Sequence, residues 1–205
     1  MPAPDGETPK IPTPSEYMRS ARPELFSDSV LVDVTLLERS QLEYHLETLT
    51  NRKEEFVFED FCKRLSEREI CPNLKPQTGP VGGGDSKTDS STYPVAPVLI
   101  ERCYWGSPNP PTDESWAFAF SAKKDWRPKV KSDILKIAEL ENGFTTVYFI
   151  TNQFVKDKTR AELEAELTEK HGFDVHIFDR QWILDVVFSH KCELLAIESL
   201  GIRVA

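Results

Sequence analysis

Two aspartates follow a glycine-rich run near the middle of the chain. In the segment "TGPVGGGDSKTD", Asp85 and Asp89 stand four residues apart. Carboxylates in such a loop can bind a divalent cation, because Mg²⁺ and Mn²⁺ prefer oxygen ligands. The glycines also suggest a phosphate-binding loop, but there the last glycine directly precedes the lysine. Here two residues separate Gly84 from Lys87, and flanking prolines disfavour the strand and helix that a P-loop requires, so an acidic metal site is favoured.

A lysine follows the next apolar segment, "SWAFAFSAKKDW". Large residues at 116, 118 and 120 alternate with small ones, which is the period of a strand. Ser121 and Lys123 therefore share one face at its end. Taken alone, Lys123 is more typical of an exposed strand end, and Asp85 and Asp89 are more typical of turn residues. Only the combination of the aspartates with the lysine indicates a site.

Basic residues are concentrated directly after this strand. The chain has a net charge of −9, which disfavours an overall basic nucleic-acid-binding protein, but "KKDWRPKVK" holds five basic residues in nine. Lys124, Arg127, Lys129 and Lys131 are candidates for contacts with phosphates. The alternative is an ordinary solvated helix face.

The chain divides into three parts by composition. Residues 1–25 are Pro-rich and predict a disordered lead, residues 26–49 an N-terminal extension or linker, and residues 50–205 one domain. No apolar run has membrane-spanning length, and the N-terminus lacks the form of a signal peptide. These features predict a cytoplasmic protein without a membrane partner. The four cysteines form no metal-binding or disulfide pattern and are expected to be buried thiols.

Helical and strand periods alternate through the last part of the chain. Asn51 and Glu54 form a potential capping box that would open a helix burying Phe58, Phe61 and Leu65, with Glu55 and Glu59 near the edge of that face. Strands are expected at 94–105, 116–123, 144–151 and 174–179, and helices at 128–141, 158–172 and 180–190. This alternation predicts an α/β fold with parallel strands.

The loop "TGPVGGGDSKTD" and the strand end "AFSAKKDW" together resemble the PD-(D/E)xK nuclease superfamily, in its Mrr-like restriction endonuclease branch. In these families the loop has a form close to T-G-x-x-x-D-G-G-x-D, whose last aspartate binds the metal, and the next strand ends in E-x-K or Q-x-K. Aligning "DSKTD" gives Asp89 as the ligand, whereas aligning "GGGD" gives Asp85. Asp89 is preferred. The resemblance covers about residues 50–190.

The resemblance implies a restriction-endonuclease-like fold, a central mixed sheet flanked by helices, and Mg²⁺- or Mn²⁺-dependent cleavage of double-stranded DNA. It implies Lys123 as the catalytic cation and a helix glutamate near the metal, for which Glu59 is the first candidate and Glu55 the second. The implied metal ligands are Asp89, Asp85, Glu59 and the backbone carbonyl of Ala122. The implied DNA contacts are Lys124, Arg127, Lys129, Lys131 and Gln77.

Ser121 departs from the family pattern, because it stands where a Glu or Gln is expected and a hydroxyl is a poorer metal ligand than a carboxylate. Either another carboxylate replaces the missing charge or the site is inactive. Two functions therefore remain open: a DNA endonuclease, or a catalytically inactive module for nucleic-acid binding or oligomerisation on the same fold. Mrr-like domains often stand at the N-terminus of large bacterial anti-phage defence NTPases, so the resemblance also implies a homo-oligomer or further domains in a longer chain.

Overall fold

The computed structural model describes residues 14–22, 25, 37–75, 88–96, 98, 111–140 and 142–204. The chain forms two compact units, Met1–Thr35 and Leu36–Ala205. In the first unit, Pro14–Ala21 form helix α1. This helix lies within the segment that the composition predicted to be a disordered lead.

The second unit contains a four-stranded mixed sheet in the order β1-β2-β3-β4. Its strands are β1 (Ser90–Ser91), β2 (Trp116–Ser121), β3 (Thr146–Thr151) and β4 (Asp174–Phe178). β1 pairs antiparallel with β2, whereas β2, β3 and β4 are parallel. The mixed α/β class predicted from the sequence is thereby confirmed.

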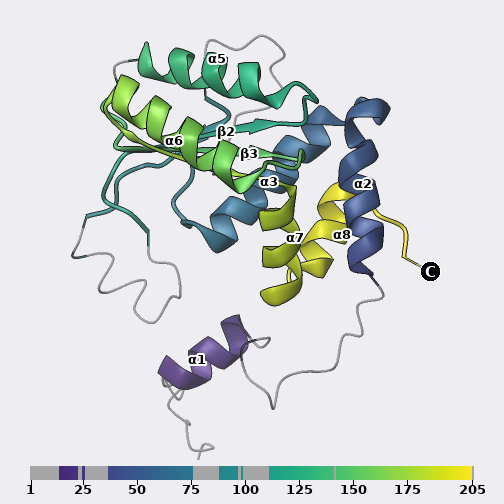
Figure 1. Cartoon of the computed structure of the whole chain (residues 1–205). Helices are drawn as coiled ribbons and strands as arrows, with labels where there is room; N and C mark the ends of the chain where they lie inside the picture. Colours follow the sequence, from purple (N-terminus) through teal and green to yellow (C-terminus); the bar gives the residue numbers. More distant parts are fainter. Residues whose placement is uncertain are drawn as a thin grey trace, which may run out of the picture. The chain divides into compact units, whose positions relative to one another are not determined.

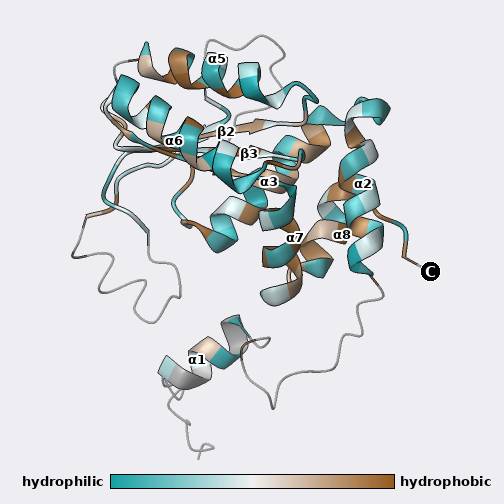
Figure 2. Ribbon diagram, viewed as in Figure 1, coloured by the Kyte–Doolittle hydropathy of each residue, from teal (hydrophilic) through white to brown (hydrophobic). Residues whose placement is uncertain are grey.

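Helices cover both faces of this sheet (Figure 1). The helices of the second unit are α2 (Arg39–Arg52), α3 (Glu55–Glu69), α5 (Trp126–Ala138), α6 (Asp157–His171), α7 (Arg180–Ser189) and α8 (Glu193–Leu200). α5 and α6 pack on one face, and α3 and α7 on the other. Hydrophilic residues cover much of α2 and α6, while α7 carries both hydrophilic and hydrophobic residues (Figure 2).

The alternation along β2 divides the hydrophobic core in two. Ala117 and Ala119 face α5 and α6, where their small side chains leave room for the helices. Phe118 and Phe120 face the helices on the opposite side. All four side chains are at most 2% exposed, so β2 is buried on both faces.

Helix α2 belongs to the core of the second unit. Leu42, Leu46 and Leu49 are fully buried on one face of the helix. The compact unit consequently begins at Leu36, earlier than residue 50, and the segment expected to be an extension or linker contributes a core helix.

The predicted capping box at Asn51 is wrong, because α2 continues through Asn51 to Arg52. Lys53 then adopts a left-handed conformation with φ 58°, and its N–H bonds to carbonyls of the last turn. α3 starts at Glu55 and buries Phe58, Phe61, Cys62 and Leu65, as the periodicity predicted.

Most other elements lie within a few residues of their predicted bounds. The buried thiols expected at Cys62, Cys71 and Cys192 are confirmed, and α8 is an element that the sequence did not indicate. Cys103 and most of the strand expected at 94–105 lie outside the described residues. In the described parts of the chain, every helix is too short or too polar to cross a bilayer.

The position of α2 predicts a large effect of truncating its buried leucines. Leu46→Ala should lower the free energy of unfolding by about 2–5 kcal/mol, because the cavity left in the core cannot collapse completely. Urea unfolding measures this change. The control is Tyr44→Ala on the same helix, where the side chain is 69% exposed and a change within about 0.5 kcal/mol is expected. Equal effects of the two substitutions would contradict the placement of α2.

Candidate active site

A pocket of about 620 Å³ opens at the carboxyl end of β2. Residues from α3, β2, α5 and the segment before β1 line it: Glu55, Glu59, Asp89, Ala119, Phe120, Ser121, Ala122, Lys123, Lys129, Asp133, Lys136 and Glu139. The structure thus brings together five residues that the sequence reasoning placed in a catalytic or metal site, namely Glu59, Asp89, Ser121, Ala122 and Lys123, together with Glu55, the second candidate for the helix glutamate.

Asp89 is held against β2 by backbone hydrogen bonds. Its N–H donates to the carbonyl of Phe118 (3.1 Å), and its Oδ2 accepts from the N–H of Phe120 (2.5 Å). β1 spans only Ser90 and Ser91, so the Asp89 side chain satisfies a strand donor beyond the end of that ladder. Asp89 is therefore a positioned, half-buried carboxylate rather than an exposed loop residue.

Glu59 comes to the same pocket from α3. Burial, followed by the nearby charge of Asp89, raises the pKa of Glu59 from 4.5 to about 7, while Lys129 opposes the rise. Burial also raises the pKa of Asp89, and its hydrogen bond from Phe120 opposes that rise. Both carboxyl groups are therefore poorly solvated and close enough to repel each other or other acids of the pocket.

Ser121 and the carbonyl of Ala122 are engaged in local hydrogen bonds. The Ser121 hydroxyl accepts from the backbone N–H of Lys123 (3.3 Å), so it shapes the turn after β2. The carbonyl of Ala122 accepts from the hydroxyl of Thr50 in α2. A carbonyl has two lone pairs, and one acceptor position of Ala122 is not used by this bond.

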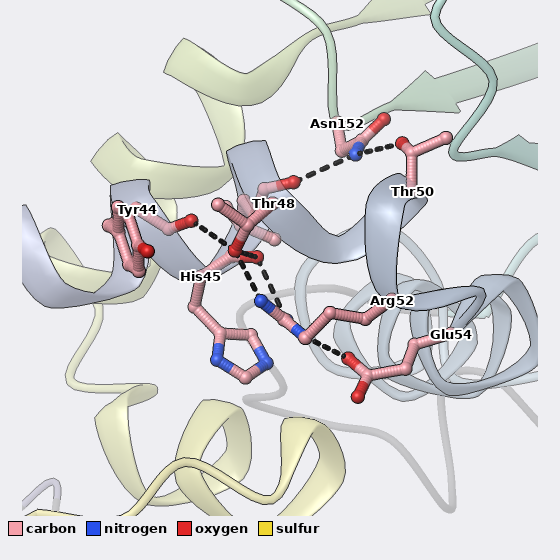
Figure 3. A network of polar contacts seen from close by, with 8 residues as sticks. Tyr44, His45, Thr48, Thr50, Arg52, Glu54 and Asn152 are labelled. Atoms are coloured by element: carbon pink, nitrogen blue, oxygen red, sulfur yellow. Dashed lines mark hydrogen bonds and ion pairs between the residues drawn. The ribbon is translucent and has the colours of Figure 1, made fainter.

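Asn152 connects this turn to the neighbouring strand and to α2. It follows β3 directly, is fully buried, and donates to the carbonyl of Leu46 (2.8 Å) and to the Thr50 hydroxyl (3.3 Å). Figure 3 shows Asn152 and Thr50 facing each other near the end of α2, beside the contacts of Arg52 with Thr48 and Glu54. The strand ends beneath the pocket are thus tied to α2.

The lysines that line the pocket, Lys123, Lys129 and Lys136, differ in their surroundings, and Nζ of Lys136 lies 3.8 Å from Oδ1 of Asp133. The Lys123 side chain is exposed, and among the described residues its ammonium group has no hydrogen bond or ion pair. Lys129 lies on the first turns of α5, and its Nζ is 2.6 Å from Oδ1 of Asp133. Asp133 is a buried carboxylate on the core-facing side of α5, beside Val130, and the sequence reasoning missed it. An aspartate at an apolar position of a helix was the available signal.

The predicted DNA-contacting residues differ in their partners and exposure. Lys129 turns to Asp133 in the pocket, and Lys131 pairs with Glu166 of α6 (2.5 Å). Lys124 and Arg127 are exposed. Gln77, like the alternative ligand Asp85, lies outside the described residues.

The donor set of the pocket fits a divalent cation that takes few ligands from the protein. Within the described ranges, no three His, Cys, Asp or Glu side chains are arranged to hold a metal ion by themselves. Mg²⁺ in enzymes of phosphate chemistry is nevertheless commonly held by one or two carboxylates, with water and substrate oxygens completing the shell. Asp89 and Glu59 fit that requirement, since two poorly solvated carboxyl groups converge there and a cation would relieve their repulsion.

No protein-family model, curated protein or solved structure matches the chain. Function must therefore be inferred from the residues of this pocket and their chemistry.

The raised pKa of Glu59 predicts a dependence of stability on pH. Between pH 4.5 and about 7 the folded chain binds more protons than the unfolded chain, so its stability should fall as pH rises through this window. Glu59→Gln should remove part of this fall and stabilise the chain at pH 8 by about 1–2 kcal/mol, after allowance for solvent screening. Urea unfolding in chelator across this pH range measures the effect, with the exposed Glu43→Gln as control. A pH dependence in Glu59→Gln that matches the wild type would contradict the burial of this charge.

Proposed function

We propose that the chain is a metal-dependent DNA endonuclease domain that hydrolyses phosphodiester bonds. The observation that carries the proposal is the convergence of Asp89, Glu59 and Lys123 on one pocket, although the three residues lie far apart in the sequence. A restriction-endonuclease-like arrangement of the mixed sheet, with β2 as the strand that delivers the lysine, is part of the same proposal. Asp85 is the alternative to Asp89.

Asp89 and Glu59 would hold the cation, Mg²⁺ or Mn²⁺, with the Ala122 carbonyl as a further oxygen donor. When bound, such a cation polarises the phosphate and offsets its negative charge. Lys123 would orient the attacking water and stabilise charge that builds on the phosphate oxygens. The exposed Lys123 side chain has the freedom to reach a substrate at the mouth of the pocket.

Glu59 supplies the negative charge that is missing at Ser121. The family pattern places a carboxylate or amide at this strand position, but the Ser121 hydroxyl accepts a backbone hydrogen bond from Lys123. Glu59 reaches the pocket from α3 and carries a pKa of about 7. At neutral pH, the ionised fraction of Glu59 can bind a cation without losing a proton.

The substrate is double-stranded DNA in this proposal, and Lys124 and Arg127 are its backbone contacts. Both are exposed and follow the strand that carries Lys123. We also propose that the domain acts in the cytoplasm, as a homo-oligomer or joined to further domains, as in bacterial anti-phage defence proteins that carry Mrr-like domains.

A second function is a catalytically inactive module for nucleic-acid binding or oligomerisation on the same fold. The engagement of Ser121 in the turn, in place of a metal-binding carboxylate, favours it. Incubating the purified chain with plasmid DNA and Mg²⁺ or Mn²⁺, with and without a chelator, separates the two functions: cleavage that the chelator abolishes supports the endonuclease.

Asp89→Asn should reduce Mg²⁺-dependent plasmid cleavage by about 100-fold or more, because an amide cannot replace the charge of the carboxylate. Asparagine retains an oxygen that can accept the hydrogen bond from Phe120, so the thermal midpoint should stay close to that of the wild type. Asp174→Asn, an exposed residue at the start of β4, is the control and should cleave normally. Full activity of Asp89→Asn would exclude Asp89 as the main ligand.

Replacing Lys124 and Arg127 together by alanine should weaken binding to all DNA sequences alike. The slope of log affinity against log salt should flatten by about 0.9 for each phosphate group that the protein no longer neutralises. Fluorescence anisotropy with a labelled duplex at several salt concentrations measures this slope. Lys170→Ala, near the far end of α6, should leave the slope unchanged; a slope that the double variant does not alter would remove both residues from the DNA interface.

A further inference from the structure

The ion pair between Lys129 and Asp133 is not explained by the needs of helix α5. The lysine precedes the aspartate by four residues, which is the less favourable order for a helix, and it lies near the positive end of the helix dipole. Aspartate is also a poor residue for a helix interior. Local helix stability would favour neither residue at its position.

Both side chains are withdrawn from solvent into the pocket. The Lys129 side chain is 26% exposed and that of Asp133 is 9% exposed, with Nζ 2.6 Å from Oδ1. The pair Lys158–Glu162 on α6 has the same order and spacing but is 89% and 60% exposed, with its atoms 3.9 Å apart. The short, shielded contact at α5 therefore reflects the pocket rather than the sequence spacing alone.

Lys129 also stands near the acids that form the proposed metal site. Its charge lowers the pKa of both Glu59 and Asp89, against the stronger effect of burial. An ammonium group has three donors, and the bond to Asp133 leaves two that can reach another acceptor.

We propose that Lys129 is a second catalytic cation, which binds a non-bridging oxygen of the substrate phosphate, and that Asp133 is its positioning residue. This inference rests on the proposed endonuclease function. In the hydrolysis, a water oxygen bonds to phosphorus and the bond from phosphorus to the leaving oxygen breaks, while the attacking water gives a proton to solvent and the leaving oxygen takes one from solvent. Lys129 transfers no proton in this step. It stays an ammonium ion and offsets the charge that accumulates on the phosphate oxygens.

The roles of the two lysines differ under this proposal. Lys129 is fixed by a buried partner on a helix, so it is suited to hold the phosphate in one place. Lys123 is at the end of β2 and is exposed, so it is suited to the attacking water at the mouth of the pocket. Lys129 thus belongs to the reaction centre rather than to the DNA-contacting surface on which the sequence reasoning placed it.

The test compares Lys129→Met with Lys158→Met, which removes the matched lysine of α6 outside the pocket. Single-turnover cleavage of a labelled duplex with Mg²⁺ should slow by about 100-fold or more in Lys129→Met, with duplex affinity changed by less than about threefold. Lys158→Met should cleave within about threefold of the wild type. Lys129→Arg keeps the positive charge and should retain more activity than Lys129→Met, which separates loss of charge from faulty folding.

The role of Asp133 is tested by a double-mutant cycle. Asp133→Asn should slow cleavage without changing KM for the duplex, and it should have little further effect in the Lys129→Met background, because it acts through Lys129. If Asp133→Asn slows cleavage by the same factor in the wild type and in Lys129→Met, the positioning role of Asp133 is overturned.

The outcomes separate this inference from the proposed function. If the wild type cleaves DNA and Lys129→Met cleaves it equally fast, the catalytic role of Lys129 is overturned but the endonuclease function is not. A wild-type chain that cleaves no DNA with either Mg²⁺ or Mn²⁺ overturns the endonuclease function and the catalytic role of Lys129 together.

Discussion

The burial of β2 on both faces is the constraint on which the rest of the second unit depends. Its alanines allow α5 and α6 to pack on one side, and its phenylalanines fill the core beneath α3 and α7 on the other. All six of its residues pair with β3, so the strand end at Ser121 is fixed beside Thr151. Since β1 is only two residues long, the Phe120 N–H donates its hydrogen bond to the carboxylate of Asp89 instead of to a carbonyl of a neighbouring strand. The same strand that organises the core therefore also positions the pocket.

The pocket gathers charge at some cost to the folded state. Burial raises the pKa of Glu59 and Asp89, and Asp133 adds a third shielded carboxylate. Lys129 and Lys136, which both pair with Asp133, compensate only part of this charge. Burying acids beside one another opposes folding unless a bound cation relieves the repulsion, and perturbed carboxyl groups of this kind are concentrated at functional sites. Glu59 and Asp133 lie on helices whose apolar residues already pack the core. Core packing therefore does not require an acid at either position.

The sequence was most informative where a local period determines structure. The alternation along Trp116–Ser121 and the apolar face of α3 predicted these elements, whereas a common site for Glu59 and Lys123 was implied only by the family resemblance. Prediction from the sequence failed where tertiary contacts determine the structure. The buried leucines of α2 extend that helix past the apparent cap at Asn51. Lys129 looked like part of a basic surface, because its partner Asp133 becomes evident only when the orientation of α5 is known. The hydrogen bond that fixes Asp89 also depends on strand pairing that the sequence does not specify.

The central claim is that Glu59 and Asp89 form a site for a divalent cation. Calorimetric titration of the wild-type chain with Mn²⁺, repeated in buffers of different ionisation enthalpy, tests it most directly, since it counts the protons displaced by the metal. Because burial raises the pKa of Glu59 to about 7, binding should release more protons at about pH 6 than at about pH 8. Absence of Mn²⁺ binding across this range, or binding without any release of protons at the lower pH, would contradict the claim.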